Sequence, residues 1–160
     1  MKKALFLDRD GVLNRERGDY TFSIEDFEVL PDVSQALKLA QEKGYLLIVI
    51  SNQGGISKGL FNQKRVEKLH GMMCEELATK GIHFDEIYYC QHHNEIGKCI
   101  CRKPDSLMLE KAIARFNIDV DKSVMIGDSQ RDVDAASKVG VRRILIDSNS
   151  GILNIIQDLE

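Results

Sequence analysis

The sequence predicts a three-layer α/β fold, in which a parallel sheet carries helices on both faces. Short apolar runs alternate along the chain with segments whose apolar residues recur at helical spacing, and this order favours right-handed crossovers between parallel strands. Small polar or acidic residues follow three of the apolar runs, as is typical of strands that end at a ligand-binding edge. We find no repeat, low-complexity tract or linker, so we expect one domain over residues 1–160.

The first half of the chain predicts two strands with a helix between them. The first strand covers residues 4–7, an apolar run that stops at two acidic residues and a glycine. Residues 15–28 are polar and are expected to form a loop. The first helix follows Asp32, which can cap its N-terminus, and ends at Gly44. A continuous apolar run over residues 45–50 then predicts the second strand, which ends in the sequence Ser-Asn-Gln-Gly-Gly.

The second half of the chain repeats the alternation. Apolar residues at helical spacing predict a helix over residues 63–80, which Gly81 closes. A short strand over residues 87–90 leads into a cysteine-rich loop. The remaining predicted elements are a helix from Ser106 to Phe116, a strand over residues 124–126, a helix over residues 131–138 and a strand over residues 143–146.

Composition excludes several classes of partner. The net charge is −3, so no basic field attracts nucleic acid or an anionic membrane. Hydrophobic residues make up 43% of the chain, yet no apolar run approaches the ~20 residues that cross a bilayer. The start, Met1-Lys2-Lys3, leads straight into a strand without a signal-like segment. We therefore expect a cytoplasmic protein that acts as a monomer on a small molecule.

Three polar clusters follow three of the predicted strands. They contain Asp8 with Asp10, Ser51 with Asn52, and Asp128 with Asp132. If the strands are parallel, all three clusters meet at one edge of the sheet. Cleavage of a phosphate ester needs a nucleophile, a proton for the leaving oxygen and positive charge for the phosphoryl oxygens. Asp8 is the candidate nucleophile, and Asp10 is the candidate acid that later takes a proton from the attacking water.

Massed carboxylates alone would repel a phosphate, so a hard cation is expected between them. Asp8 and Asp128 would hold Mg²⁺ together with the backbone carbonyl of Asp10 and waters, and Asp132 would lie in the outer shell. Helix capping alone is an alternative explanation of Asp128. The Ser51 hydroxyl and nearby N–H groups can donate to the phosphate, which the two following glycines allow to approach closely.

Two basic residues, Arg102 and Lys103, lie just before the third predicted helix. Lys103 is a candidate to neutralise the phosphate and the nucleophile, whereas Arg102 is a candidate to grip a more distant group of the substrate. A solvated basic pair without a role is the alternative.

Four soft or borderline metal ligands crowd into one loop. They are Cys90, His92, Cys99 and Cys101. In a cytosolic chain this clustering favours a metal over a disulfide, and the ligand set suits tetrahedral, structural Zn²⁺ with no open position for catalysis. His93 in place of His92, or free thiols, are the alternatives. No role is predicted for Cys74, His70 or His83.

Together these motifs resemble the haloacid dehalogenase (HAD) superfamily of phosphohydrolases. Four segments carry the resemblance: Asp8-x-Asp10-Gly11, Ser51, Lys103, and Gly127-Asp128 with Asp132. The resemblance implies a capless, Rossmann-like HAD domain with an aspartyl-phosphate intermediate and Mg²⁺. It also implies a zinc-bound loop that partly stands in for a cap. Family roles carry over as Asp8 nucleophile, Asp10 acid/base, and Ser51 and Lys103 phosphoryl stabilisers, with Asn52, Gln53, Gly54 and Arg102 as substrate-binding residues.

Within the superfamily the chain is similar to the heptose bisphosphate phosphatase and histidinol-phosphatase subgroup. Asp-Arg-Asp-Gly-Val-Leu-Asn, Tyr-Tyr-Cys-Gln-His-His and Cys-Ile-Cys-Arg-Lys-Pro carry this likeness. It implies removal of the 7-phosphate of D-glycero-D-manno-heptose 1,7-bisphosphate, a step toward lipopolysaccharide and other bacterial surface glycans. The spacing from His92 to Cys99 matches histidinol-phosphatase domains, whereas residues 52–59 resemble the heptose group. Residues 15–20 align only loosely, so histidinol phosphate remains an alternative substrate.

Two functions of other classes are also considered. Phospho-acceptor signalling domains group aspartates and a lysine at a sheet edge, but here the second strand ends in Ser51-Asn52 and offers no acceptor aspartate. A zinc-stabilised interaction module without catalysis would leave Asp10 with no role.

Overall fold

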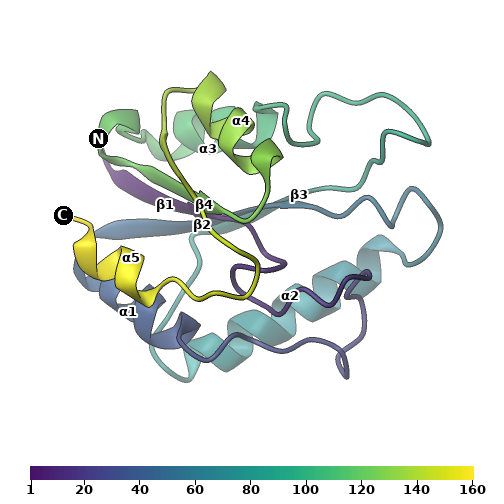
Figure 1. The fold of residues 1–160 in the computed structure, drawn as a ribbon, viewed down its shortest axis with the longest axis horizontal. Coiled ribbons are helices and arrows are strands. Elements are labelled where there is room, and N and C mark those ends of the chain that lie inside the picture. The colour runs from purple at the N-terminus through teal and green to yellow at the C-terminus, as the bar shows by residue number, and fades with distance from the viewer.

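The computed structural model describes all residues, 1–160, and contains one five-stranded sheet (Figure 1). The strands are β1 (Lys3–Leu7), β2 (Tyr45–Asn52), β3 (Glu86–Cys90), β4 (Val124–Gly127) and β5 (Arg142–Leu145). All neighbouring strands run parallel, in the order β3-β2-β1-β4-β5. The prediction of a parallel α/β sheet is confirmed.

Helices cover both faces of the sheet, so the predicted three layers are confirmed (Figure 1). The helices are α1 (Val33–Glu42), α2 (Gln63–Ala78), α3 (Leu107–Phe116), α4 (Gln130–Lys138) and α5 (Leu153–Asp158), with a single 3-10 turn at Val120–Lys122. Side chains of α1, α2 and α5 belong to one apolar core, and those of α3 and α4 belong to the other. No helix joins the length to the apolar character that crossing a bilayer requires.

The central strand β1 serves both cores because its side chains alternate between the two faces. Leu5 and Leu7 enter one core, whereas Ala4 and Phe6 enter the other. Each is fully buried. A strand buried on both sides must be apolar throughout, which explains the unbroken run before the first acidic residue.

The strand order reverses next to β1, because β2 lies on one side of it and β4 on the other. Leu7 pairs with Val49 of β2 and with Ile126 of β4, so the three strands end at one edge. Ligands of open α/β sheets bind where the order reverses. The residues that follow β1 and β4 therefore face the position where a site is expected.

Asp32 differs from its predicted role. Its side chain makes no capping bond to α1. Instead its Oδ2 accepts hydrogen bonds from the backbone N–H groups of Ile152 and Leu153, each at 2.8 Å. The carboxylate thus stabilises the start of α5, a short C-terminal helix that the sequence analysis did not predict. These N–H groups lie far from Asp32 in the sequence, so local sequence pattern could not predict that Asp32 caps α5 and not α1.

Candidate active site

A cleft of about 470 Å³ opens at the carboxyl ends of β1, β2 and β4. It collects residues from all three predicted polar clusters and from the basic pair, including Asp8, Asp10, Asn52, Lys103 and Asp128. Only one of its 16 lining residues is hydrophobic. Such a lining suits a strongly hydrophilic ligand and not an apolar one.

Three carboxylates gather in the cleft, as the sequence predicts. Oxygen atoms of Asp8, Asp128 and Asp132 all lie within 4.8 Å of one another. The pKa of Asp8 is raised to about 7, chiefly because it is buried; Lys103 lowers this pKa, while the neighbouring aspartates raise it further. A bound divalent cation would relieve this repulsion, so the donor set fits Mg²⁺, which prefers carboxylate oxygens.

The protein's own contacts leave room for such an ion on two of the three acids. Lys103 Nζ and the Arg9 N–H both contact Asp8 at Oδ1, and the Ser148 hydroxyl donates to Asp128 at Oδ2. Asp132 is engaged at both oxygens, by Lys103 Nζ at 2.5 Å and by the N–H of Ser129 at 3.1 Å. Asp132 therefore has the contacts of an outer-shell group, in keeping with its predicted position.

Gly11 allows the loop after β1 to pass close to Asp128. Its φ is +85°, and a Cβ at this position would collide with the Asp128 carboxylate. The backbone N–H of Asn149 donates to the carbonyl of Gly11 at 2.8 Å, which fixes the loop from the other side. A residue with a side chain here would push the first and third polar clusters apart.

Asp10 is held differently from Asp8. Its Oδ1 accepts from Arg9 Nη2 at 2.9 Å and Asn14 Nδ2 at 2.9 Å, and its Oδ2 accepts from Gln53 Nε2 at 3.1 Å. Burial alone would raise the pKa of Asp10, but the Arg9 charge and these hydrogen bonds hold it below the usual value. The pKa values of the two aspartates of the first motif are thus shifted in opposite directions, although a single residue separates them.

The residues after β2 connect Asp10 to Lys103. Gln53 Nε2 donates to Asp10 and also to the Ser51 hydroxyl, at 2.8 Å, so the buried Ser51 lies beside the first motif. The Asn52 amide donates to the carbonyl of Lys103 at 3.1 Å and accepts from its N–H at 3.0 Å. Asn52 therefore fixes the Lys103 backbone. It also lines the cleft, and its contact with substrate stays a prediction.

Lys103 lies at the centre of the site and is only 1% exposed. Its ammonium group contacts Asp8 at 3.0 Å and the carbonyl oxygen of Ile50 at 2.6 Å, in addition to Asp132. Burial alone would lower the pKa of Lys103, but the charges of Asp8 and Asp132 raise it. The lysine is therefore a fixed positive charge next to the candidate nucleophile.

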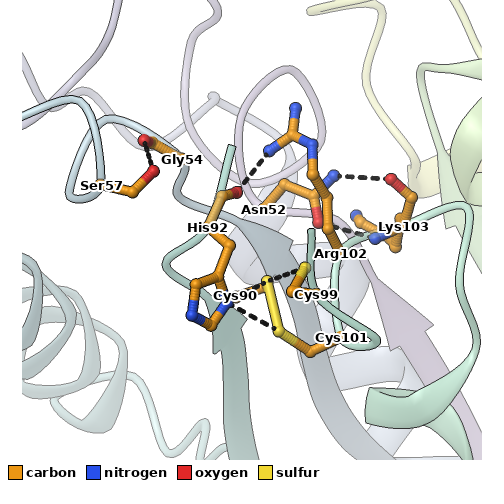
Figure 2. The surroundings of a disulfide bond; sticks show 9 residues. All are labelled: Asn52, Gly54, Ser57, Cys90, His92, Cys99, Cys101, Arg102 and Lys103. Carbon is orange, nitrogen blue, oxygen red and sulfur yellow. Dashed lines mark hydrogen bonds between the residues drawn. A yellow bond between two sulfur atoms is a disulfide. The ribbon is translucent and has the colours of Figure 1, made fainter. Parts of the chain in front are cut away.

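Arg102 lies on the wall of the same cleft. Its Nη1 donates to the carbonyl oxygen of His92 at 3.1 Å (Figure 2). A Cβ at position 54 would lie 2.9 Å from Nη1, so Gly54 makes room for the guanidinium. Arg131, which the sequence analysis did not single out, lines this wall as well, and neither arginine forms an ion pair with an acid. Burial and the charge of Arg131 lower the pKa of Arg102.

The four predicted zinc ligands come together at the end of β3 (Figure 2). Cys90 Sγ lies 3.7 Å from Cys99 Sγ, and His92 Nδ1 lies 3.5 Å from Cys90 Sγ and 3.3 Å from Cys101 Sγ. A tetrahedral Zn²⁺ with bonds of about 2.3 Å to sulfur and about 2.0 Å to nitrogen spaces these atoms about 3.5–3.8 Å apart. The donor set therefore fits zinc, with His92 and not His93 in the cluster.

In the structure Cys90 and Cys101 are joined as a disulfide (Figure 2), which is the alternative to a metal ion at the same cluster. The sequence analysis favoured metal over disulfide. The two states exclude each other, since zinc needs both sulfurs as thiolates. Cys99 keeps its thiol.

Comparison with known proteins places this site among phosphatases. A family model described as "HAD-hyrolase-like" matches residues 100–152. The D-glycero-beta-D-manno-heptose-1,7-bisphosphate 7-phosphatase of Haemophilus ducreyi is 42% identical over 158 residues, which cover 94% of this chain and 86% of that protein. The D-glycero-alpha-D-manno-heptose-1,7-bisphosphate 7-phosphatase of Photorhabdus laumondii is 36% identical over 150 residues, which cover 90% and 81%.

A solved structure agrees with these relatives. The crystal structure of D,D-heptose 1,7-bisphosphate phosphatase from B. bronchiseptica, complexed with magnesium and phosphate, superposes with a TM-score of 0.86. It is 30% identical, and the match covers 97% of this chain and 85% of that one.

Proposed function

The chain belongs to the D-glycero-D-manno-heptose-1,7-bisphosphate 7-phosphatases of the HAD-like hydrolases, and from this premise we propose how its cleft hydrolyses the 7-phosphate of that substrate. The observation that carries the proposal is the different environment of Asp8 and Asp10. Asp8 contacts Lys103 and the other acids, whereas Asp10 is held by neutral amides and Arg9. Two carboxylates in unlike environments suit a nucleophile paired with an acid/base.

In the first step Asp8 attacks phosphorus, and the bond from phosphorus to the sugar oxygen breaks as Asp10 gives that oxygen its proton. Asp10 is ionised in the free protein because its pKa is low, and the negative substrate phosphate raises this pKa when it binds beside it. In the second step a water attacks phosphorus and passes a proton to Asp10, while the bond from phosphorus to Asp8 breaks, which releases phosphate and restores the Asp8 carboxylate. Mg²⁺ held by Asp8, Asp128 and the Asp10 carbonyl would keep Asp8 ionised and offset the phosphate charge.

Ser51 and Lys103 stabilise the transferring phosphoryl group. The Lys103 ammonium supplies a fixed charge, and the Ser51 hydroxyl and nearby backbone N–H groups supply donors. Asn52 acts through Lys103, whose backbone it holds, and Gln53 and Gly54 line the approach to the phosphate.

The second phosphate of the substrate binds at the wall of the cleft, on Arg102 and Arg131. Both guanidinium groups face the cleft without an acidic partner, so their charges repel each other in the free protein. A phosphate between them removes this repulsion and can accept paired hydrogen bonds. Histidinol phosphate carries a single phosphate and would leave this positive wall without a counter-charge.

The cysteine cluster binds structural Zn²⁺ when its thiols are reduced. The distances among Cys90, Cys99 and His92 support this proposal, and four protein ligands leave no position for a reacting water. The ion would hold the loop that ends at Arg102.

Phosphate release tests the proposed function. Purified protein with Mg²⁺ should release one phosphate from at least one anomer of heptose 1,7-bisphosphate, with repeated turnover and with a larger kcat/KM than on histidinol phosphate. A preference for histidinol phosphate would overturn the substrate assignment. A single phosphorylation without turnover would indicate a signalling domain instead.

A further inference from the structure

Arg9 lies between the two aspartates of the first motif and is 0% exposed. We propose that Arg9 and the buried His70 form a positioning pair that fixes which oxygen of Asp10 exchanges the proton with the substrate. The proposal rests on the function assigned above to Asp10. Nothing in the motif predicted a role for either residue.

A buried guanidinium is unfavourable unless its N–H groups find acceptors. Arg9 Nη2 donates to Asp10 Oδ1 at 2.9 Å and to the carbonyl oxygen of Thr21 at 2.9 Å, while Nε donates to Asp10 Oδ1 at 3.3 Å. Nη1 has one partner, His70 Nε2, at 3.2 Å. His70 is therefore the group that completes the hydrogen bonding of the Arg9 guanidinium.

His70 lies on the inner side of α2 and is 6% exposed. Its ring packs edge-on against Tyr89, with 5.6 Å between ring centroids, so its orientation is fixed. Because a guanidinium can only donate, His70 Nε2 must accept, and the ring is neutral with its proton on Nδ1. Burial and the Arg9 charge lower the pKa of His70 to about 3, in agreement with this assignment.

The pair makes the two oxygens of Asp10 unequal. Oδ1 receives two N–H groups of Arg9 and one of Asn14, whereas Oδ2 receives only the Gln53 amide. An oxygen that already accepts three hydrogen bonds is a poor site for a proton. Oδ2 therefore carries the transferred proton, and Arg9 prevents the carboxylate from rotating Oδ1 into its place.

This role predicts a dependence on the leaving group. A sugar alkoxide needs the proton that Asp10 supplies, but 4-nitrophenolate leaves without one. If the pair positions Asp10, its loss must slow the sugar phosphate more than 4-nitrophenyl phosphate. A purely structural role would slow both substrates by the same factor.

The test compares His70→Leu, which removes the acceptor, with His70→Gln, whose amide oxygen can replace it. His83→Leu is the matched control, because His83 is exposed and its ring has no recorded contact. In His70→Leu we expect kcat/KM on the sugar phosphate, which reports the first step alone, to fall about tenfold more than kcat/KM on 4-nitrophenyl phosphate, since misplaced catalytic groups cost up to about 100-fold. His70→Gln should recover most of the loss, and His83→Leu should match the wild type.

Equal losses on both substrates, or no loss in His70→Leu, would overturn the proposal. Should that variant not fold, nitrogen NMR of the wild type decides, because a charged His70 or a proton on Nε2 contradicts the pair. The comparison also survives failure of the assigned substrate. Any alkyl phosphate that the wild type hydrolyses can replace the heptose bisphosphate in the ratio.

Discussion

Lys103 and Arg102 are neighbours in the chain, yet different parts of the molecule hold them. Lys103 belongs to what we term the cleft floor, with Asp8, Asp10 and Asp128. The three acids follow buried strands, and Lys103 is held beside them by Asp8 and by the carbonyl oxygen of Ile50 in β2. Arg102 directly follows the cysteine loop, residues 91–101, which contains no helix or strand. The one hydrogen bond of its side chain goes to the His92 carbonyl. The floor is therefore positioned by the sheet, and the loop by its cysteine and histidine cluster.

Because the two regions are positioned independently, each should control a different property of the enzyme. The floor should determine the rate of the chemical step, because its groups touch the reacting phosphate. The cysteine loop should determine affinity for the second phosphate, because it positions Arg102. Asn52 hydrogen-bonds the Lys103 backbone, so Lys103 should stay in place in the floor even when the cysteine loop loosens.

The largest effect should come from the floor. Asp8→Asn should abolish turnover, since the amide cannot form the aspartyl-phosphate. It should not lower the unfolding midpoint in metal-free buffer, because burial already disfavours the charge of Asp8. Phosphate release and thermal unfolding measure the two properties. Asp105→Asn, at an exposed acid, is the control, and substantial turnover by Asp8→Asn would contradict the account.

The cysteine loop should give a smaller effect of another kind. Cys99→Ser should lose bound zinc and raise KM for the bisphosphate about tenfold, the value of a charge-assisted hydrogen bond of about 1.5 kcal/mol. The kcat and the affinity for Mg²⁺ should change little. Metal analysis and steady-state kinetics measure these quantities, with Cys74→Ser as the control. Unchanged zinc content would refute the ligand assignment, and a collapse of kcat would refute the separation of the two regions.

Arg131 tests whether the wall of the cleft controls affinity for the second phosphate. Arg131→Ala should raise KM for the bisphosphate about threefold to fivefold, since exposed ion pairs contribute up to about 1 kcal/mol. KM for a heptose 7-phosphate, which lacks the second phosphate, should not change. Steady-state kinetics on both substrates measure the two KM values, and an equal rise in both would exclude a contact between Arg131 and the second phosphate.

The last effect concerns the stability of the protein and not its catalysis. Since the pKa of His70 is about 3 when folded and near 6.5 when unfolded, only the unfolded chain binds a proton between these values. The free energy of unfolding should therefore fall as the pH drops below about 6.5. From pH 7 to pH 5 wild type should lose about 2 kcal/mol more than His70→Gln. Urea unfolding at both pH values measures the difference. Identical losses in wild type and His70→Gln would mean that folding does not lower the pKa of His70.

Local pattern predicted the sheet and the first four helices, because apolar runs and helical spacing mark each of them. It also predicted the carboxylates of the cleft, because they come directly after strands. The short helix α5 was missed, since six residues give little periodicity. Arg9, His70 and Arg131 were missed for another reason. Their partners lie far away in sequence, as the sequence separation of 61 between Arg9 and His70 illustrates, and only the packing of α2 and α4 against the sheet edge brings them to the site.

Rapid acid quench during turnover, followed by mass spectrometry of the peptide that contains Asp8, tests the central claim most directly. The account predicts a phosphoryl group on Asp8 while heptose 1,7-bisphosphate is being hydrolysed, and none in Asp8→Asn. Full turnover with Asp8 never phosphorylated, or with the phosphoryl group on another residue, would contradict it.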